Sequence, residues 1–343
     1  VGGSGVILTS SDGITWTPQT GGSGSIQEII WDGSKFVATS SPSLTLTSTD
    51  GITWTSPGGT ESTLNSIAWS GSLYVGVGLS GLIRTSPDLI TWTTRTSGIS
   101  GTMESIAWSG NNFIAVGRDG ILIRSSDGIT WVNASNAGYR TLNKVKLFNS
   151  VLYACGDDGK IIKSSDHGVT WLSTGLYRTW YVSNNDSGNI IWRDIAFDGE
   201  RFVAIGTFIG NQTSSLARII VTESVDGYNW GIPVIAYSSA ADEIVARWDR
   251  QMNGFMVGNS TLNATGSLSM LYRSSNGTWS TYMVSAYNNN SPGILPVSGI
   301  YPVEPCLLLL NFSSSDLAIS YLNFDSTPLN QSKLTSIIYS LWN

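Results

Sequence analysis

A run of aromatic, amide and acidic residues between positions 177 and 191 stands out as a candidate ligand site. It contains Tyr177, Trp180, Tyr181, Asn184, Asn185 and Asp186. Aromatic rings stack on the apolar face of a sugar, while amides and carboxylates bond its hydroxyl groups. The run therefore predicts carbohydrate contact, with the alternative that Trp180 folds down and only anchors its own loop. Further candidates for the same ligand are Phe208, Asn211, Tyr287 and Asn288.

Carboxylates in the same half of the chain could form a hydrolytic pair, because glycoside cleavage needs two carboxyl groups beside the scissile bond. The candidates are Asp186, Asp194, Asp242 and Glu243. The single histidine, His167, lies in a repeated turn, which argues against His-based catalysis and His-rich metal sites. We therefore expect a protein without catalytic residues, cofactor or metal, and glycosidase activity is the alternative.

The motif Ser-x-Asp-Gly-x-Thr-Trp recurs every 38 or 39 residues in the first half of the chain. Copies occur at 10–16, 48–54 and 125–131, with variants at 86–92, 164–171, 224–230 and 274–279. The Asp can accept bonds from turn N–H groups, the Gly permits positive φ, and the Trp fills apolar space. A scaffold role is therefore expected, with metal binding by one Asp as the alternative. The residues concerned are Asp12, Trp16, Asp50, Trp54, Asp88, Trp92, Asp127, Trp131, Asp166, Trp171, Asp226 and Trp230.

Each repeat has the pattern of four short strands, which within 63–93 fall at 64–69, 73–78, 82–85 and 90–93. Four antiparallel strands in about 40 residues predict one blade of a β-propeller. The chain should therefore be all-β and form a single propeller over 1–343. We predict eight blades, with seven as the alternative. Their ranges are 24–59, 60–98, 99–138, 139–176, 177–240, 241–284 and 285–331, and a closing blade joins 1–20 to 332–343, which pairs N- and C-terminal strands and removes open sheet edges.

Insertions gather on one face of this predicted ring. If the strands are numbered outward from the axis, the turns between strands one and two and between strands three and four share one face and stay short. The longer segments lie between strands two and three or between blades, at 177–191, 207–217, 259–267 and 285–296. Binding usually resides in variable loops on a rigid scaffold, so the ligand is expected on the face of the insertions.

The repeated motif resembles the Asp-box, or bacterial neuraminidase repeat, over roughly residues 1 to 280, and the copy at 164–171 keeps the family spacing. The resemblance implies a propeller like those of sialidases and sortilin-type receptors. The Phe/Tyr-Arg-Ile-Pro motif of sialidases is missing, because Thr follows both Tyr139-Arg140 and Tyr177-Arg178. Residues 31–38 and the sequence Ser-Asp-Gly-Ile-Thr-Trp also look like propeller domains of phage tail fibres and virion-tip proteins.

Composition narrows the setting and the partners. Charged residues make up 12% of the chain and the net charge is −6, with no basic run that would suit a nucleic acid. No apolar stretch reaches the ~20 residues of a membrane span. With the resemblance, this favours a virion-associated or extracellular adhesion protein that binds a glycan or cell-surface receptor. The alternatives are a secreted bacterial glycoside hydrolase and an assembly factor. Val1 begins inside a repeat, so we expect upstream sequence that contacts other virion proteins.

Overall fold

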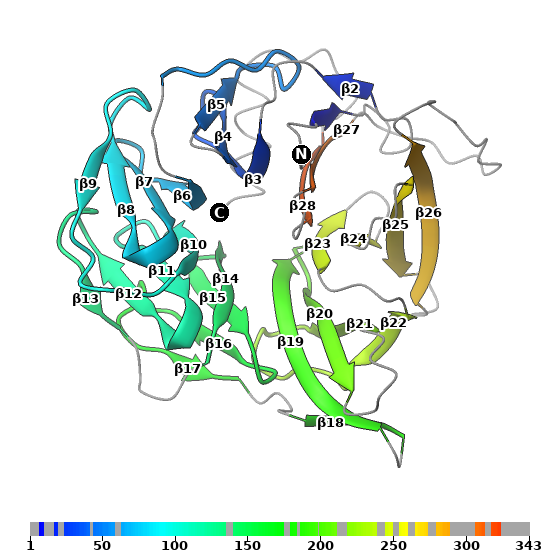
Figure 1. The fold of residues 1–343 in the computed structure, drawn as a ribbon. Coiled ribbons are helices and arrows are strands. Elements are labelled where there is room, and N and C mark those ends of the chain that lie inside the picture. Colours follow the sequence, from blue (N-terminus) through cyan, green and yellow to red (C-terminus); the bar gives the residue numbers. More distant parts are fainter. Residues whose placement is uncertain are drawn as a thin grey trace.

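The computed structural model describes residues 7–9, 17–19, 24–41, 44–58, 63–134, 140–174, 179–183, 186–197, 199–210, 218–238, 244–249, 254–259, 265–273, 279–288, 306–312 and 317–323. These residues form antiparallel sheets that stand around a central opening (Figure 1). The helices within these ranges are two 3-10 turns, η2 (Leu79–Gly81) and η3 (Arg118–Gly120). No helix in the described part of the chain has the length and apolar character to cross a membrane.

Six of the sheets are built from strands that follow one another in the sequence. The first three contain β3 (Ser25–Trp31), β4 (Phe36–Ser41) and β5 (Leu44–Ser48); β6 (Leu64–Trp69), β7 (Tyr74–Gly78), β8 (Ile83–Ser86) and β9 (Thr93–Arg95); and β10 (Met103–Trp108), β11 (Phe113–Gly117), β12 (Leu122–Ser125) and β13 (Val132–Asn133). The next three contain β14 (Leu142–Phe148), β15 (Val151–Gly156), β16 (Ile161–Ser164) and β17 (Leu172–Ser173); β18 (Thr179–Ser183), β19 (Asp186–Phe197), β20 (Phe202–Gly210), β21 (Arg218–Ser224) and β22 (Val234–Ser238); and β23 (Ile244–Asp249), β24 (Gly254–Asn259), β25 (Thr265–Arg273) and β26 (Trp279–Asn288).

Two further sheets have two strands each. They are β1 (Ile7–Thr9) with β2 (Thr17–Gln19), and β27 (Cys306–Phe312) with β28 (Leu317–Asn323). β1 lies beside β27, although the two are separated by most of the sequence. The C-terminal part of the predicted closing blade, 332–343, lies outside the described residues, and with it residues 334–340, which would form its first strand.

The innermost strand of each sheet contacts the two inner strands of the sheet before it. β6 lies against β3 and β4, β10 against β6 and β7, and β14 against β10 and β11. The series continues with β19 against β14 and β15, β23 against β19 and β20, and β28 against β23 and β24. These contacts set the order of the sheets around the opening.

Apolar side chains fill the spaces between neighbouring sheets. Val75 and Val77 of β7, for example, pack in one cluster with Met103, Ile106 and Phe113 of the following sheet. Burying a side chain of this size contributes about 1.5–3 kcal/mol, so the stability of the ring depends on contacts between sheets as much as within them. Strand β7 is buried along its whole length because it is covered on both faces.

The innermost strands β3, β6, β10, β14 and β19 each contain a β-bulge. It lies close to the first residue in the first four strands, and in β19 it follows the half of the strand that pairs with β18. The pairing register shifts at Ile26/Glu28, Leu64/Ser66, Met103/Ser105, Leu142/Lys144 and Trp192/Asp194. A bulge leaves one residue of the strand unpaired and redirects its side chain. Two of these extra residues are asparagines that reach the next sheet: Asn65 Nδ2 donates to the Met103 carbonyl at 2.9 Å, and Asn143 Nδ2 donates to the Trp192 carbonyl at 2.9 Å.

At three of the bulges, the residue that follows the bulge accepts a bond from the following sheet. The N–H of Ile106 donates to Ser66 Oγ at 3.0 Å, and the N–H of Val145 donates to Ser105 Oγ at 3.3 Å. The N–H of Ile67 donates to Glu28 Oε2 at 3.3 Å. Backbone donors that do not bond the second strand are thereby satisfied, which buried N–H groups require.

The repeated turn is held by its own carboxylate. In residues 125–131, Asp127 Oδ1 accepts bonds from the N–H groups of Ile129 and Thr130, each at 2.8 Å. Trp131 Nε1 donates to the Gly128 carbonyl at 3.2 Å. Asp50, Asp88, Asp166 and Asp226 accept equivalent backbone bonds. Asp12 and Trp16 lie outside the described residues. Within the described ranges, no group of His, Cys, Asp and Glu could hold a metal ion.

The first insertion forms a hairpin, whereas the sequence predicts a loop over 177–191. β18 pairs with the first half of β19, which gives this sheet a fifth strand, and Figure 1 shows the hairpin extending away from the ring. The other insertions also lengthen strands in part, because residues 207–210, 265–267 and 285–288 belong to β20, β25 and β26. Aromatic and β-branched residues such as Trp180, Tyr181 and Ile190 favour extended backbone over an open loop.

Two glycines with positive φ differ in what surrounds them, so substituting each one distinguishes the cost of backbone strain from the cost of a packing clash. Gly168, in a repeated turn, has a φ of +83°, and a Cβ there would lie 2.2 Å from Ile114 Cδ1 of the preceding sheet. Gly110 has a φ of +93° with nothing within 4 Å. Gly110→Ala should lower the unfolding free energy by about 1–2 kcal/mol, and Gly168→Ala by roughly 2–5 kcal/mol. Urea denaturation of both variants measures the difference, and equal losses would contradict the packing of this turn between sheets.

Acid should weaken the repeated turns. The N–H groups of Thr130 and Ile129 lower the pKa of Asp127 to about 2, whereas an unfolded Asp titrates near 3.9. The folded pKa is the lower one, so the stabilisation is complete above pH ~4 and is lost as the pH falls to ~2. Asp127→Asn keeps an acceptor oxygen but not the charge. Urea denaturation between pH 7 and 2 measures the unfolding free energy of both proteins. At pH 7 the variant should lose less than ~1 kcal/mol, because this carboxylate is exposed. Between pH 4 and 2 its unfolding free energy should fall less than that of the wild type. An equal fall in the unfolding free energy of variant and wild type under acid would show that the Asp127 charge does not stabilise the turn.

Candidate functional site

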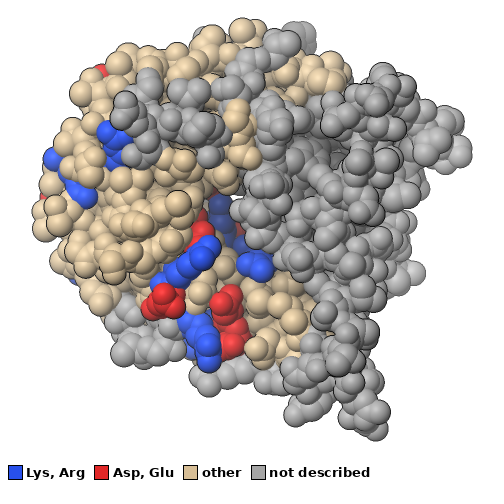
Figure 2. Space-filling view, in the orientation of Figure 1, with Lys and Arg blue, Asp and Glu red and all other residues tan. Residues whose placement is uncertain are grey.

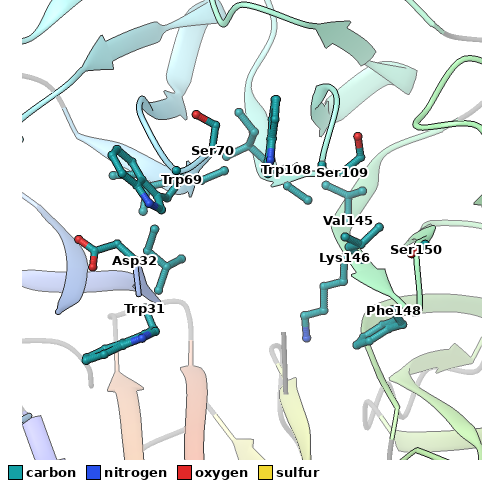
Figure 3. Close-up of a pocket in the computed structure, with 18 of the residues that line it drawn as sticks. Trp31, Asp32, Trp69, Ser70, Trp108, Ser109, Val145, Lys146, Phe148 and Ser150 are labelled. Carbon is teal, nitrogen blue, oxygen red and sulfur yellow. The ribbon is translucent and has the colours of Figure 1, made fainter. Parts of the chain in front are cut away.

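A cavity of about 690 Å³ lies on the axis of the ring, among the described residues. It is lined by the innermost strands β3, β6, β10, β14 and β19 and by the turns that follow them. Figure 3 shows these strands presenting side chains to one central space. The volume falls within the ~300–1,000 Å³ of small-ligand sites.

Aromatic residues stand at the mouth of this cavity, at the end of each lining strand. We call them the aromatic rim, and they are Trp31, Trp69, Trp108, Phe148 and Phe197. All five side chains are partly exposed. Trp69 packs on Tyr74 across the turn with ring centroids 4.0 Å apart, and Trp108 packs on Phe113 at 4.5 Å. The rim is therefore held from behind by second-strand aromatics and faces outward at the axis.

The indole nitrogens of the rim lie on its inner side. Figure 3 shows the nitrogens of Trp69 and Trp108 turned toward the central space, with the six-membered rings farther from it. Trp31 Nε1 is buried and has no hydrogen-bond partner in the described structure. An indole N–H can only donate, so Trp69 and Trp108 present donors toward the central space, whereas the buried nitrogen of Trp31 does not.

Below the rim, the cavity wall consists mostly of small apolar side chains. Ala68, Ala107 and Ala196 occupy equivalent positions on three strands, and Ile30 takes that position on β3. On β14 the same position holds Lys146, which reaches into the central space in Figure 3. The alanines leave room for a ligand, and Lys146 is the one charged residue at this repeated position on the five lining strands.

Two ion pairs hold the charged groups of the cavity. Lys144 Nζ lies 2.6 Å from Glu28 Oε1, and Lys146 Nζ lies 2.5 Å from Asp194 Oδ1. Lys146 also donates to the Ile195 carbonyl at 3.1 Å. The Lys146 pair joins neighbouring sheets. The Lys144 pair joins β14 to β3, which are separated around the ring by the sheets of β6 and β10.

Asp32, at the edge of the cavity, holds the turn after β3. Its Oδ1 accepts bonds from the N–H groups of Ser34 at 2.7 Å and Lys35 at 2.8 Å, and its Oδ2 pairs with Lys35 Nζ at 2.8 Å. The Tyr74 hydroxyl also donates to Oδ2. Burial alone would raise the pKa of Asp32, but the bonds from Lys35 and Tyr74 outweigh it and lower that pKa. Burial and the Asp32 charge raise the pKa of Tyr74. The cluster is thus suited to fixing the rim and not to transferring protons at neutral pH.

His167 connects two sheets beside the cavity. Its Nδ1 lies 2.9 Å from the Ser109 carbonyl, which requires the proton on Nδ1, and its own carbonyl accepts a bond from Asn112 Nδ2 at 2.9 Å. The sequence places this histidine in a scaffold turn opposite the expected ligand face. The structure keeps it in that turn, but the turn borders the axial cavity.

Most of the ligand residues predicted from sequence cannot be compared with this site. Tyr177, Asn184, Asn185 and Asn211 lie outside the described residues. Only the backbone is described for Trp180, Tyr181 and Asp186, in the β18–β19 hairpin, and for Tyr287 and Asn288, in β26. Phe208 is the exception.

Phe208 is a core residue. It lies in β20 with 0% of its side chain exposed and packs with Trp192 and Ile220. The prediction that it faces a ligand is therefore wrong, because the segment continues the strand and turns this ring into the space between sheets.

The axial cavity opens among the turns between first and second strands, on the face opposite the insertions. The sequence analysis assigns no ligand role to Trp31, Trp69 or Trp108, which stand at the ends of β3, β6 and β10. The signal available was the recurrence of an aromatic residue just before the first turn. Trp248 fits the same pattern, because it pairs with Phe255 in the register that joins Trp31 to Phe36.

Charge near the axis is mixed in sign. Figure 2 shows Lys and Arg beside Asp and Glu around the central opening, whereas the described outer surface is mostly uncharged. Of the carboxylates predicted as a hydrolytic pair, Asp194 is 2% exposed and bonds both Lys146 and the N–H of Ile195. The side chains of Asp186, Asp242 and Glu243 are outside the description.

No protein-family model matches the sequence, and no curated protein matches it. Among solved structures, the WD40 β-propeller domain of Doa1 is similar with a TM-score of 0.53 and 14% identity, over 93% of this chain and 96% of that chain. A structure of YCF48 bound to D1 peptide has a TM-score of 0.51 and 14% identity, over 75% and 82%. The GH74 enzyme of Niastella koreensis has a TM-score of 0.51 and 15% identity, over 74% of this chain and 37% of that chain. At such identities the likeness shows the fold alone, and the fold is a β-propeller.

The ion pair between β3 and β14 should couple distant parts of the ring. Lys144→Met leaves Glu28 without its partner, so unfolding free energy should fall by about 1–3 kcal/mol, less than for a fully buried pair because both side chains are partly exposed. Adding Glu28→Gln should restore part of that loss. A double-mutant cycle by urea denaturation should give a coupling energy of at least ~0.5 kcal/mol. Additive losses would mean that the pair does not bind the two sheets together.

Proposed function

We propose that this protein is a non-catalytic binding propeller that holds a glycan in its axial cavity. The aromatic rim carries the proposal, because its rings are partly exposed where the cavity opens and recur on successive strands. A pyranose has apolar faces that stack on such rings and hydroxyls that need donors and acceptors. The rim supplies indole donors from Trp69 and Trp108.

The state of the cavity carboxylates favours binding over hydrolysis. Glu28 is engaged by Lys144, and Asp32 by Lys35 and Tyr74. A glycosidase needs one carboxyl group as a proton donor and a second facing the sugar ring. Secreted glycoside hydrolase activity remains the alternative function, and turnover would reveal it.

The repeated turns and the low charge support an extracellular setting. We propose a virion-associated adhesion protein of the Asp-box type, similar to propellers of phage tail fibres, whose target is a glycan or cell-surface receptor. A chain with only 12% charged residues agrees with that setting. Residues 177–186, with Trp180 on the β18–β19 hairpin, are proposed as a second contact region on the opposite face.

Ring closure belongs to this proposal as well. β28 contacts β23 and β24 as the other innermost strands contact their predecessors, while β27 contacts both β1 and β3. This order supports a closing blade of β28, β27, β1 and β2, and hence seven blades. The eight-blade prediction depends on residues 334–340, which lie outside the described structure.

Binding to a glycan array, with hydrolysis of fluorogenic glycosides on the same sample, tests the function. Wild-type protein should bind without turnover. Trp69→Ala and Trp108→Ala should each weaken binding at least ~tenfold, since a central aromatic contact contributes about 2 kcal/mol or more. Tyr228→Ala removes a ring that is 44% exposed outside the cavity and should bind as wild type. Turnover, or rim variants that bind normally while folded by circular dichroism, would contradict the proposal.

A further inference from the structure

We infer that the cavity takes the terminal residue of an uncharged glycan, end-on, and does not bind the middle of a chain. The inference rests on the proposed glycan function and adds which part of the glycan enters and which charge class is selected. Two observations carry it: an ion pair across the axis, and the pairing of the charged groups that line the cavity.

The ion pair narrows the cavity below the rim. Glu28 and Lys144 both line the cavity, and their charged atoms meet at 2.6 Å although they come from β3 and β14. Two sheets separate these strands around the ring, so side chains that meet between them cross the axial space. We call the ion pair of Glu28 and Lys144 the bridge. A sugar ring that enters past the aromatic rim would meet the bridge, and a glycan chain could not pass while the two side chains are paired.

The bridge is anchored and will not move aside cheaply. Glu28 Oε2 also accepts the N–H of Ile67 at 3.3 Å, so displacing the carboxylate would leave a backbone donor without its partner. The Glu28 and Lys144 side chains are 12% and 24% exposed, and separating a partly desolvated pair is unfavourable. The ligand therefore ends at the bridge.

Charge pairing selects against charged ligands. Lys144 is neutralised by Glu28, Lys146 by Asp194, and Asp32 by Lys35. A carboxylate or ammonium on the ligand would have to break one of these pairs or remain uncompensated in the cavity, and both are costly. A neutral sugar needs only stacking and hydrogen bonds, which the rim offers.

The test compares chain ends and charges directly. Neutral and acidic oligosaccharides attached to an array through their reducing ends present defined terminal residues. The expected binders are neutral and share a terminal sugar, whatever residues lie beneath it. Isothermal titration of one such binder should show affinity reduced at least ~tenfold when a further sugar caps its end, a change of about 1.4 kcal/mol. A cyclic oligosaccharide of the same sugar should not bind.

Two double variants distinguish the effect of the bridge on ligand selection from a general effect of removing an ion pair. The double substitution Glu28→Gln with Lys144→Met should reduce the discrimination against the capped and cyclic ligands at least ~threefold while the rim still binds. Glu104→Gln with Arg118→Met removes a glutamate–arginine ion pair, 2.7 Å long, outside the cavity, and should leave the discrimination unchanged.

Each outcome bears on a different claim. Binders that share an acidic group, or that bind equally when capped or cyclic, would overturn this inference and leave the glycan function standing. An unchanged discrimination in the bridge variant would show that the pair does not stop the chain. An array without any binder would contradict the proposed function and the inference with it.

Discussion

The β-bulge of the innermost strands β3, β6, β10, β14 and β19 is the constraint on which the packing of these five sheets depends. An innermost strand has a partner on only one edge, so its other backbone groups need bonds from elsewhere. The bulge directs Asn65 and Asn143 toward the next sheet, and the residues that follow it, such as Ser66 and Ser105, accept N–H groups there. One irregularity, present in five of the described sheets, thus satisfies backbone donors and acceptors that face the neighbouring sheet.

The same regularity explains why the axis can hold a ligand site. A repeated backbone position places aromatic residues at the mouth on β3, β6, β10 and β19, with apolar residues beneath them. On β14 that position holds Leu147, and Phe148 follows it. Function then appears where the repeat is broken. Lys144 and Lys146 on β14, with Glu28 on β3, put charges where other strands carry serine, alanine or isoleucine, and those charges are paired with one another or with Asp194. The repeated positions form the wall of the axial cavity, and the charged residues that depart from the repeat line its interior.

The sequence predicts the repeated sheets better than it predicts the residues of the candidate site. The turn motif predicts the sheets because Asp, Gly and Trp act within seven or eight residues, as Asp127 and Trp131 do. The bulges and the pairing of Lys144 with Glu28, 116 positions away, depend on how sheets assemble, and no local pattern encodes them. The expectation for Phe208 fails for the same reason, since burial in β20 is decided by the neighbouring sheet. The rim was visible as a recurrence and was interpreted only as structure.

The most direct measurement is a crystal structure of the protein with the tightest-binding neutral glycan from an array. The account predicts a sugar ring against Trp69 and Trp108, with its terminal residue above Glu28 and Lys144. A glycan seated on the β18–β19 hairpin or between the outer strands, with none in the axial cavity, would contradict it.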